Sequence, residues 1–422
     1  MTFAGPSLCQ PAPRWTLRSR ALLVIALALL VPVTTNWLSW TYQNADFPVK
    51  PRDFIIGFGG LMLMLEVFNR PAFCWQALLP AGFVLFRVID AAVLQRYSVV
   101  ALGTHEFYVM IMLSNFIVTL LLILLPSTER GAGIACWLAS VVILACTAAN
   151  LYEWAGYGSF TRIPGRMSGY LEDPNHSPIL MCLLLGILFT INPGFWWNIT
   201  MTGIAAVGIA ITLSRSGMAV FAGMALVYIG KNFRQHAKGI LIIAALTVPL
   251  AVAGFTFLAQ SARSGVTTNE DVGARLEAIY NLDFEKIKSP ERAKDLEDGL
   301  EAVGRAIMFG HGTGAGNNQW QPHNQFVSVW LDLGIFGLIF FAGLVLTLLV
   351  LSVRQRFRGI YCVMPVLLFI PCSQVLLDTP VYWLTITVAL YTLIPRRIKF
   401  TLFNQRAIST HAVPSMNLQL SR

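Results

Sequence analysis

The sequence predicts an all-α membrane protein that crosses the bilayer about twelve times, and three observations support this. Apolar residues make up 56% of the 422 residues and charged residues only 12%, with a mean hydropathy of +0.64. Such a composition is too apolar for a soluble domain of this length. The apolar residues are gathered in runs that approach or reach the roughly twenty residues a spanning helix needs. Short basic tracts flank several of these runs.

The candidate spans follow one another with short connections until residue 260. The first follows three arginines, as a signal peptide would, but it lacks a small-residue cleavage site and further spans come directly after it. We therefore expect it to be a retained helix. The expected spans are 21–40, 53–69, 71–94, 107–126, 132–152, 177–193, 198–214, 217–231, 239–260, 325–352, 359–377 and 379–395.

Basic residues give the expected orientation. With twelve spans, four basic clusters all fall on the cytoplasmic side, as the positive-inside rule requires. The clusters are Arg14, Arg18 and Arg20; Lys231, Arg234 and Lys238; Arg354, Arg356 and Arg358; and Arg396, Arg397 and Lys399. This placement explains the net charge of +9 without a nucleic-acid partner. The seven cysteines show no CxxC or His-paired spacing, so neither a metal site nor a disulfide framework is expected.

This topology predicts how the chain is organised. The expected parts are a cytoplasmic N-terminus (1–20), nine spans (21–260), a large outer loop (261–324), three spans (325–395) and a cytoplasmic tail (396–422). The connections 153–176 and 214–216 lie on the same outer face as the large loop. We therefore expect any chemistry on the extracytoplasmic side.

The large outer loop is the one long hydrophilic segment, and it holds ten of the 21 acidic residues. Apolar residues recur at helical spacing after a helix start at Ser289-Pro290-Glu291; they are Leu296, Leu300, Val303 and Ile307. One or two amphipathic helices are expected here. A glycine-rich stretch, 310–316, then leads through Pro322-His323-Asn324 into the tenth span.

Arg215 lies between two apolar runs with almost no loop to separate them. An arginine at such a depth is costly unless an anion or a water-filled cavity receives it. It could be a snorkelling side chain at a helix end. The alternative is a phosphate ligand, since its planar fork can hold phosphate oxygens in a bidentate way. The small residues Ser214, Ser216 and Gly217 leave room for this second role.

His323 lies where the large loop re-enters the membrane, and Asn324 follows it. A lone histidine is most often structural. Its unperturbed pKa near 6.5 nevertheless suits a general base at neutral pH, and a neutral imidazole here could accept a proton from a sugar hydroxyl.

The segment 166–176 is the second notable outer connection. Turn residues alone would explain it. Glu172 and Asp173 could instead hold Mg²⁺ beside a phosphate, although two adjacent acids are a weak signal. In the third span, Arg87 and Asp90 most simply pair with each other, with a transporter-like proton relay as the alternative.

Several of these segments together resemble a known family, the O-antigen ligase and polysaccharide polymerase superfamily of bacterial inner membranes. The matching segments are Thr212-Leu213-Ser214-Arg215-Ser216-Gly217, Gly310-His311-Gly312-Thr313-Gly314, Pro322-His323-Asn324-Gln325, the helix from Trp330 to Leu338, and the stretch from Arg166 to Asn175. They cover roughly residues 160–345. Each motif is short, but their order, spacing and shared side of the membrane make the combination fairly specific.

The resemblance implies a GT-C-like fold and a metal-independent glycosyltransferase without a cofactor. It implies transfer of an undecaprenyl-diphosphate-linked glycan to a sugar hydroxyl of lipid A-core, on the periplasmic face of the inner membrane. By the same resemblance Arg215 holds the diphosphate and His323 activates the acceptor hydroxyl. Arg166 and Asn324 join the substrate-binding residues. A further loop arginine contacts the donor, with Arg292 the candidate and Arg275 and Arg305 competing.

Other functions remain open. A polymerase that extends the carrier-linked chain would use the same donor chemistry as a ligase. A transporter or flippase would place ionisable residues at the midplane, whereas here the strongest signals share one face. A scaffolding protein would not need Arg215 and His323 on that face.

Overall fold

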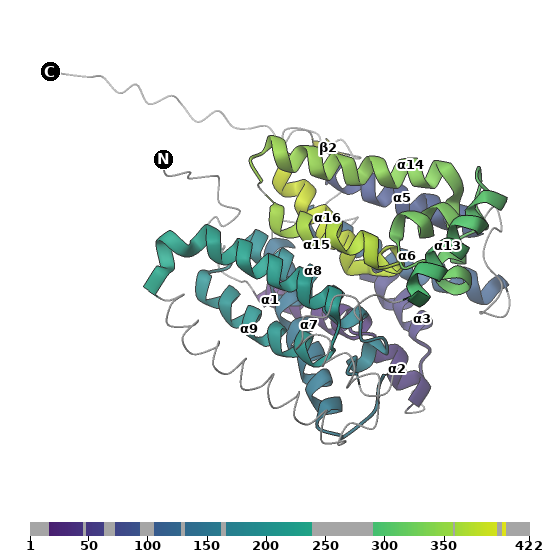
Figure 1. Ribbon diagram of the computed structural model, residues 1–422. Coiled ribbons are helices and arrows are strands. Elements are labelled where there is room, and N and C mark those ends of the chain that lie inside the picture. Colours follow the sequence, from purple (N-terminus) through teal and green to yellow (C-terminus); the bar gives the residue numbers. More distant parts are fainter. Residues whose placement is uncertain are drawn as a thin grey trace, which may run out of the picture.

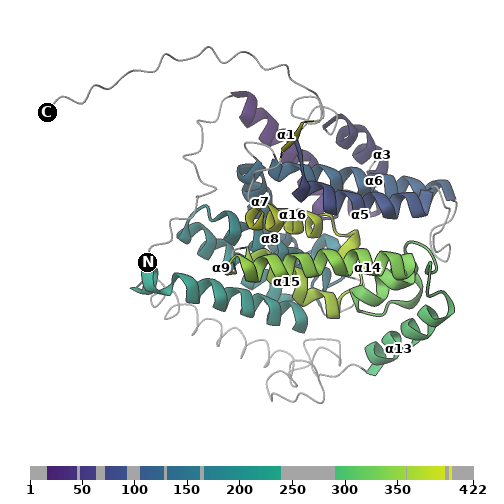
Figure 2. The same cartoon turned by 90° about the horizontal axis from the view of Figure 1, so that it is seen from above.

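The computed structural model describes residues 17–44, 48–62, 72–92, 105–127, 131–161, 166–238, 290–357, 359–394 and 399–401. Within these ranges the fold is a bundle of helices (Figures 1 and 2). The predicted span 239–260, the loop up to residue 289 with Arg275, and most of both terminal segments lie outside the described residues.

The elements follow the apolar runs closely. The first part of the chain forms α1 (Leu17–Thr34), α2 (Trp37–Asn44), α3 (Pro51–Phe54), α5 (Trp75–Ala92), α6 (His105–Leu124), α7 (Gly131–Trp154), α8 (His176–Ile191) and α9 (Phe195–Ile211). The second part forms a helix over residues 215–238, α13 (Pro290–Arg305), α14 (Gln325–Arg354), α15 (Ile360–Phe369) and α16 (Pro380–Leu393). Single helical turns are η1 (Ile55–Gly59), η3 (Leu125–Ser127), η4 (Gly169–Leu171), η5 (Gly316–Trp320), η6 (Ile370–Cys372) and η7 (Leu376–Asp378).

One short pairing departs from the all-α expectation within the described ranges. Strand β1 (Ala72–Cys74) pairs antiparallel with β2 (Lys399–Thr401), so that Ala72 lies opposite Thr401. It joins the start of α5 to the chain that follows α16. The other regular elements in the described ranges are helices.

The expected count of about twelve spans is not confirmed. Among the described residues, α7 and α14 are long and apolar enough to cross a membrane alone, and α1 with α2 would make a third span bent by 63°. The bend differs from the predicted single helix 21–40 because Asn36 adopts a left-handed conformation (φ 60°). Several other apolar helices are shorter, for example α8 with 16 residues, and at 1.5 Å per residue these fall short of a 30 Å hydrocarbon layer.

The core is centred on α8, which is apolar on every side and almost entirely buried. Helices α7, α9, α15 and α16 surround it. A helix that is hydrophobic all round is stable only inside such a bundle. The N-terminus of α8 is therefore a rigid support for the 166–176 loop that precedes it.

Helix α13 begins at Pro290, as predicted, and lies at one end of the bundle beside the start of α14 (Figures 1 and 2). Its buried residues Ala302 and Val303 pack with Leu296 against Val327 and Leu331 of α14. Leu300 and Ile307, which recur with Leu296 at helical spacing in the sequence, are exposed. The helix ends at Arg305, before Ile307, and its contact face runs through Leu296 and Ala302 instead.

Candidate active site

The segment 212–217, here called the arginine turn, connects α9 to the next helix. Leu213 reverses the chain with a left-handed backbone (φ 53°). Arg215 was expected in a connection between spans 198–214 and 217–231, but it stands in the first turn of the helix 215–238. Ser214 caps that helix: its carbonyl accepts from the Met218 amide at 2.9 Å, and its Oγ accepts from the Gly217 amide at 3.4 Å.

This position matters for the charge that Arg215 can bind. The first turn of an α-helix carries amide groups without intrahelical partners and a partial positive charge. An arginine placed there adds a full charge and a planar donor fork. The arginine turn therefore has the features of an anion site.

Close packing fixes where the arginine turn lies. A Cβ added to Gly217 would stand 2.4 Å from the Pro178 Cβ of α8, so only glycine permits this approach. Cys182 of α8 also contacts the Gly217 carbonyl oxygen, at 3.9 Å from its Sγ. The start of the helix 215–238 is thus held against the start of α8.

The 166–176 loop is held by the buried carboxylate of Glu153, near the end of α7. Its Oε1 accepts from the amides of Phe160 and Thr161, both at 2.7 Å. Its Oε2 accepts from Ser168 at 2.7 Å and Gly169 at 3.0 Å. Four backbone donors on one carboxylate give this loop a fixed path.

Arg166 and Asn175 join this loop to the arginine turn. Arg166 is buried; its Nε donates to the Thr212 carbonyl and its NH2 group to Asn175 Oδ1, both at 3.1 Å. Ser214 Oγ donates to the same Asn175 oxygen at 3.2 Å. Arg166 therefore lies beside the arginine turn, where its hydrogen bonds position the loop.

His323 lies between the described part of the large loop and α14, with a left-handed backbone (φ 49°). Its Nε2 is 3.7 Å from Asp295 Oδ2 of α13. The charges of Arg292 and Asp173 also act on it, and the side chain of Gln374 hydrogen bonds to the ring. Three segments distant in sequence thus meet at this imidazole.

These neighbours set the protonation of His323. Burial lowers its pKa below the usual 6.5, and the Arg292 charge lowers it further. Asp295, Asp173 and the Gln374 hydrogen bond act in the opposite direction without cancelling the shift. The imidazole is therefore neutral at pH 7 and able to accept a proton.

The arginine turn and His323 approach the same loop. Asp173 acts on His323, while Asn175, two residues on, bonds Ser214 beside Arg215. Asp173 Oδ2 also lies 3.6 Å from His176 Nε2 at the start of α8. The 166–176 loop thus links the two predicted site residues.

Asn324 has a structural role in this arrangement. Its Oδ1 accepts from the amides of Phe326 at 3.0 Å and Val327 at 3.3 Å, which caps α14. Helix capping alone explains why an asparagine stands at this position, and no contact with a ligand is needed to explain it.

The competing loop arginines differ in their surroundings. Arg292 acts electrostatically on His323 and on Cys372. Arg305 is paired with Glu301 on its own helix and is largely exposed. Of these two, Arg292 is the one whose charge acts on His323.

The glycine-rich stretch 310–316, here called the glycine turn, packs on α14 where that helix is broken at Gly334 (φ 66°). The His311 amide donates to the Leu331 carbonyl at 2.6 Å, and the Gly316 amide to Asp332 Oδ1 at 2.8 Å. A Cβ on Gly310 would stand 2.6 Å from the Gly334 nitrogen. The turn therefore fixes the chain that leads to His323.

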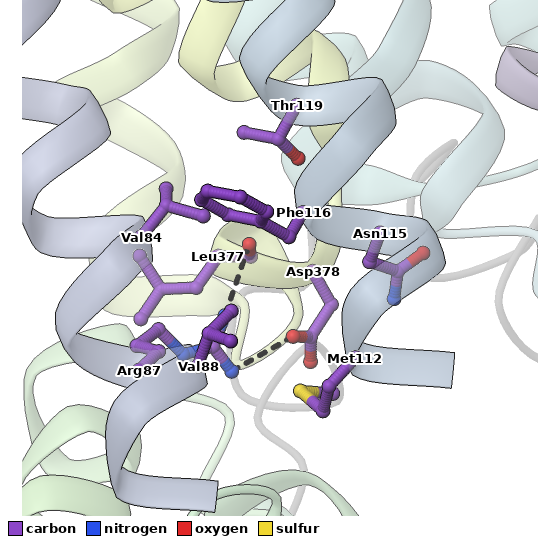
Figure 3. Close-up of a pocket in the computed structure, with 9 residues that line it drawn as sticks. All are labelled: Val84, Arg87, Val88, Met112, Asn115, Phe116, Thr119, Leu377 and Asp378. Carbon is purple, nitrogen blue, oxygen red and sulfur yellow. Dashed lines mark hydrogen bonds and ion pairs between the residues drawn. The ribbon is translucent and has the colours of Figure 1, made fainter. Parts of the chain in front are cut away.

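Asp332 also belongs to an ionic cluster around the buried Arg87, and Figure 3 shows the contacts of Arg87 with Leu377 and Asp378 in this cluster. Arg87 Nη2 is 2.8 Å from Asp378 Oδ1 and 3.7 Å from Asp332 Oδ2, and Nη1 donates to the Leu377 carbonyl at 3.2 Å. Asp90 Oδ2 accepts from Thr313 of the glycine turn at 3.2 Å. The expectation of a simple pair between Arg87 and Asp90 misses these distant partners, which tie α5 to the glycine turn and to η7.

Four residues of this site have a strained backbone. Glu172, Leu213, Gln321 and His323 all have positive φ values, a conformation that costs energy outside glycine. They are half of the eight described non-glycine residues with this conformation; the others are Asn36, Asn192, Arg356 and Phe357.

Among the described residues, Glu172 and Asp173 are not part of a group of metal ligands. Within the described ranges, no three His, Cys, Asp or Glu side chains cluster as metal ligands would. Asp173 Oδ1 instead accepts from the Asn175 amide at 2.7 Å, the geometry of an Asx-turn.

Sequence reasoning missed Glu153, Asp295, Asp332 and Asp378. A lone acid inside an apolar run, such as Glu153 or Asp332, was available as a signal because a charge at that depth requires partners. The partners themselves lie up to 291 residues away, as for Arg87 and Asp378, and could not be read from the sequence.

Comparison with known proteins gives a family match. Residues 200–342 match a family model described as O-antigen ligase. The matched region contains the arginine turn, α13, the glycine turn and His323. No curated protein matches the chain.

Proposed function

We propose, from the match of residues 200–342 to the O-antigen ligase family model, that the protein transfers a polyprenyl-diphosphate-linked glycan to a sugar hydroxyl. The proposed donor carrier is undecaprenyl diphosphate and the proposed acceptor is lipid A-core. The proposed site faces the periplasm from the bacterial inner membrane. The observation that carries the proposal is the link, through the 166–176 loop, between a helix-terminal arginine and a neutral histidine.

In the proposed reaction the anomeric carbon of the donor changes partners. The acceptor oxygen bonds to that carbon while the bond from the carbon to the diphosphate oxygen breaks. The hydroxyl proton passes to His323, and the bonding electron pair leaves with the diphosphate. Stabilising this leaving charge is the main electrostatic demand on the site.

Arg215 and Arg292 are the proposed ligands of that diphosphate. Arg215 acts together with the amides at the start of its helix, and Arg292 approaches from α13 on the side of His323. Fixed arginines placed where charge develops can do the work of a metal ion. The hydrogen bonds of Arg166 to Thr212 and Asn175 hold the arginine turn against the 166–176 loop.

The genetic test is the lipopolysaccharide profile of a strain lacking this gene, with a plasmid-borne copy as the control. A ligase predicts loss of all long chains together with accumulated carrier-linked polymer. A polymerase, the alternative function with the same donor chemistry, predicts instead a lipid A-core capped with a single repeat unit.

The biochemical test uses the purified protein with carrier-linked glycan in detergent, where no compartments exist. Glycan transfer under these conditions supports an enzyme and excludes a flippase. Arg215→Lys is expected to impair transfer, because a point charge cannot replace the bidentate fork. Wild-type activity in this variant would identify Arg215 as a snorkelling side chain.

A further inference from the structure

Five aromatic rings form a cluster beside the candidate site. They come from α2 (Trp40), the end of α7 (Tyr152), the following segment (Tyr157, Phe160) and η4 (Tyr170). Neighbouring ring centroids are 4.8 Å apart for Phe160 and Tyr170, 4.9 Å for Trp40 and Phe160, and 5.5 Å for Tyr152 and Tyr157. Contacts at these distances hold the rings as one unit.

The cluster is attached to the site through backbone contacts. Tyr170 precedes Asp173 by three residues, and its carbonyl accepts from the Asn36 side chain at 2.9 Å. Glu153 holds the amides of Phe160 and Gly169 with the two oxygens of one carboxylate. The same group therefore positions both the aromatic cluster and the 166–176 loop.

The cluster is buried on one side and open on the other. Phe160 is 7% exposed, whereas Tyr152 is 50% and Tyr157 74% exposed. The inner rings support the two outer tyrosines, which keep an apolar ring face and a phenol hydroxyl available. Core packing does not require tyrosines at these exposed positions.

We propose that Tyr152 and Tyr157 form a stacking subsite for sugar rings of the donor glycan, beyond the sugar that reacts. The C–H face of a pyranose matches an aromatic ring, and its hydroxyls match the phenol groups. The rings are uncharged, so the surface suits a sugar chain rather than the diphosphate. The donor is favoured over the acceptor because this loop bonds the arginine turn directly, through Asn175 and Ser214.

This subsite rests on the proposed function, and its test separates the two. The probes are two donors extracted as carrier-linked glycans, one with a single repeat and one with many repeats. Both carry the same diphosphate. A change in the stacking subsite should alter the KM for the long donor only, whereas a change in the diphosphate site should alter the KM for both donors.

The test variant is Tyr152→Ala/Tyr157→Ala. Its KM for the long donor is expected to rise about tenfold, equivalent to roughly 1.4 kcal/mol, with kcat unchanged and the short donor handled as by wild type. Long glycan freed from its carrier by mild acid should inhibit wild type and not this variant. Tyr152→Phe/Tyr157→Phe, which keeps the ring faces, should restore most of the affinity.

The matched control is Trp196→Ala, because Trp196 is 62% exposed and lies toward the other end of α7, where Trp197 hydrogen bonds Ser140. If this control loses the same affinity, the tyrosines are membrane-interface anchors and the subsite is rejected. An equal KM change for both donors, or a change in acceptor KM alone, would also reject it. If the wild-type protein transfers glycan from neither donor, the proposed function itself is overturned, and the subsite with it.

Discussion

His323 stands among charges of both signs, so its protonation is the property that most directly controls the proposed reaction. Burial and Arg292 lower its pKa, while Asp295 and Asp173 raise it. The general base is active when neutral, so kcat/KM should fall as the pH drops through this lowered pKa, below 6.5. A pH profile of kcat/KM for glycan transfer measures this limb in the free enzyme.

Replacing Asp295 tests the direction in which this residue shifts the pKa of His323. Asp295→Asn removes a charge that favours the imidazolium, so the pKa of His323 should fall and the acidic limb of the profile should move to lower pH. Glu297→Asn, on an exposed position of the same helix, is the control and should leave the limb in place. A limb that stays in place in Asp295→Asn would show that Asp295 does not act on the catalytic base, and a limb that moves to higher pH would contradict the sign of its effect.

Glu153 supplies a second prediction about a single side chain. In Glu153→Gln one carboxylate oxygen becomes an NH₂ group facing backbone donors, so two amides lose their acceptor in a buried place. The free energy of unfolding should fall by about 2 kcal/mol or more, and transfer should fall with it because the 166–176 loop is no longer fixed. Thermal unfolding in detergent and a transfer assay measure the two effects. Unchanged values in both would mean that the loop holds its path without the carboxylate.

The helix 215–238 shows how packing places a functional group. Gly217→Ala would push a methyl group into Pro178 and displace the start of this helix from α8. We expect a loss of about 1–3 kcal/mol in stability and weaker donor binding, measured with carrier-linked glycan. Gly230→Ala on the same helix meets open space and is the matched control. Equal donor binding by both variants would contradict this placement of Arg215.

Helical elements could be predicted well where apolar runs were long, and less well at their ends. The start of α13 was predicted from Ser289-Pro290-Glu291 and is observed at Pro290. The end of α9 and the start of the next helix were misplaced, because polar residues at 214–216 suggested a connection. Ser214 was the available signal, since serine is a preferred helix cap.

At the level of the whole molecule, the sequence could not show which helices are central. Lipid-facing and protein-facing positions are both apolar, so α8, buried on every side, has the same kind of composition as α14, which is partly exposed. The ionic cluster of Arg87, Asp332 and Asp378 was hidden for a related reason. Its members are far apart in sequence, and the fold alone brings them together.

The charge distribution of the site leads to a prediction for the complete protein. Arginines hold the diphosphate in the proposed reaction, so transfer should continue at an unchanged rate in EDTA. The assay uses membranes washed with EDTA and a parallel sample with Mg²⁺ restored. Loss of transfer that Mg²⁺ restores would return Glu172 and Asp173 to consideration as metal ligands.

The most direct test of the account separates donor binding from transfer in His323→Ala. The purified variant, reconstituted in lipid nanodiscs, is measured for its affinity for carrier-linked glycan and for its single-turnover transfer to lipid A-core. The account predicts near wild-type donor affinity, because Arg215 and Arg292 remain, with transfer reduced at least about a hundredfold by loss of the general base. Transfer at the wild-type rate would contradict it.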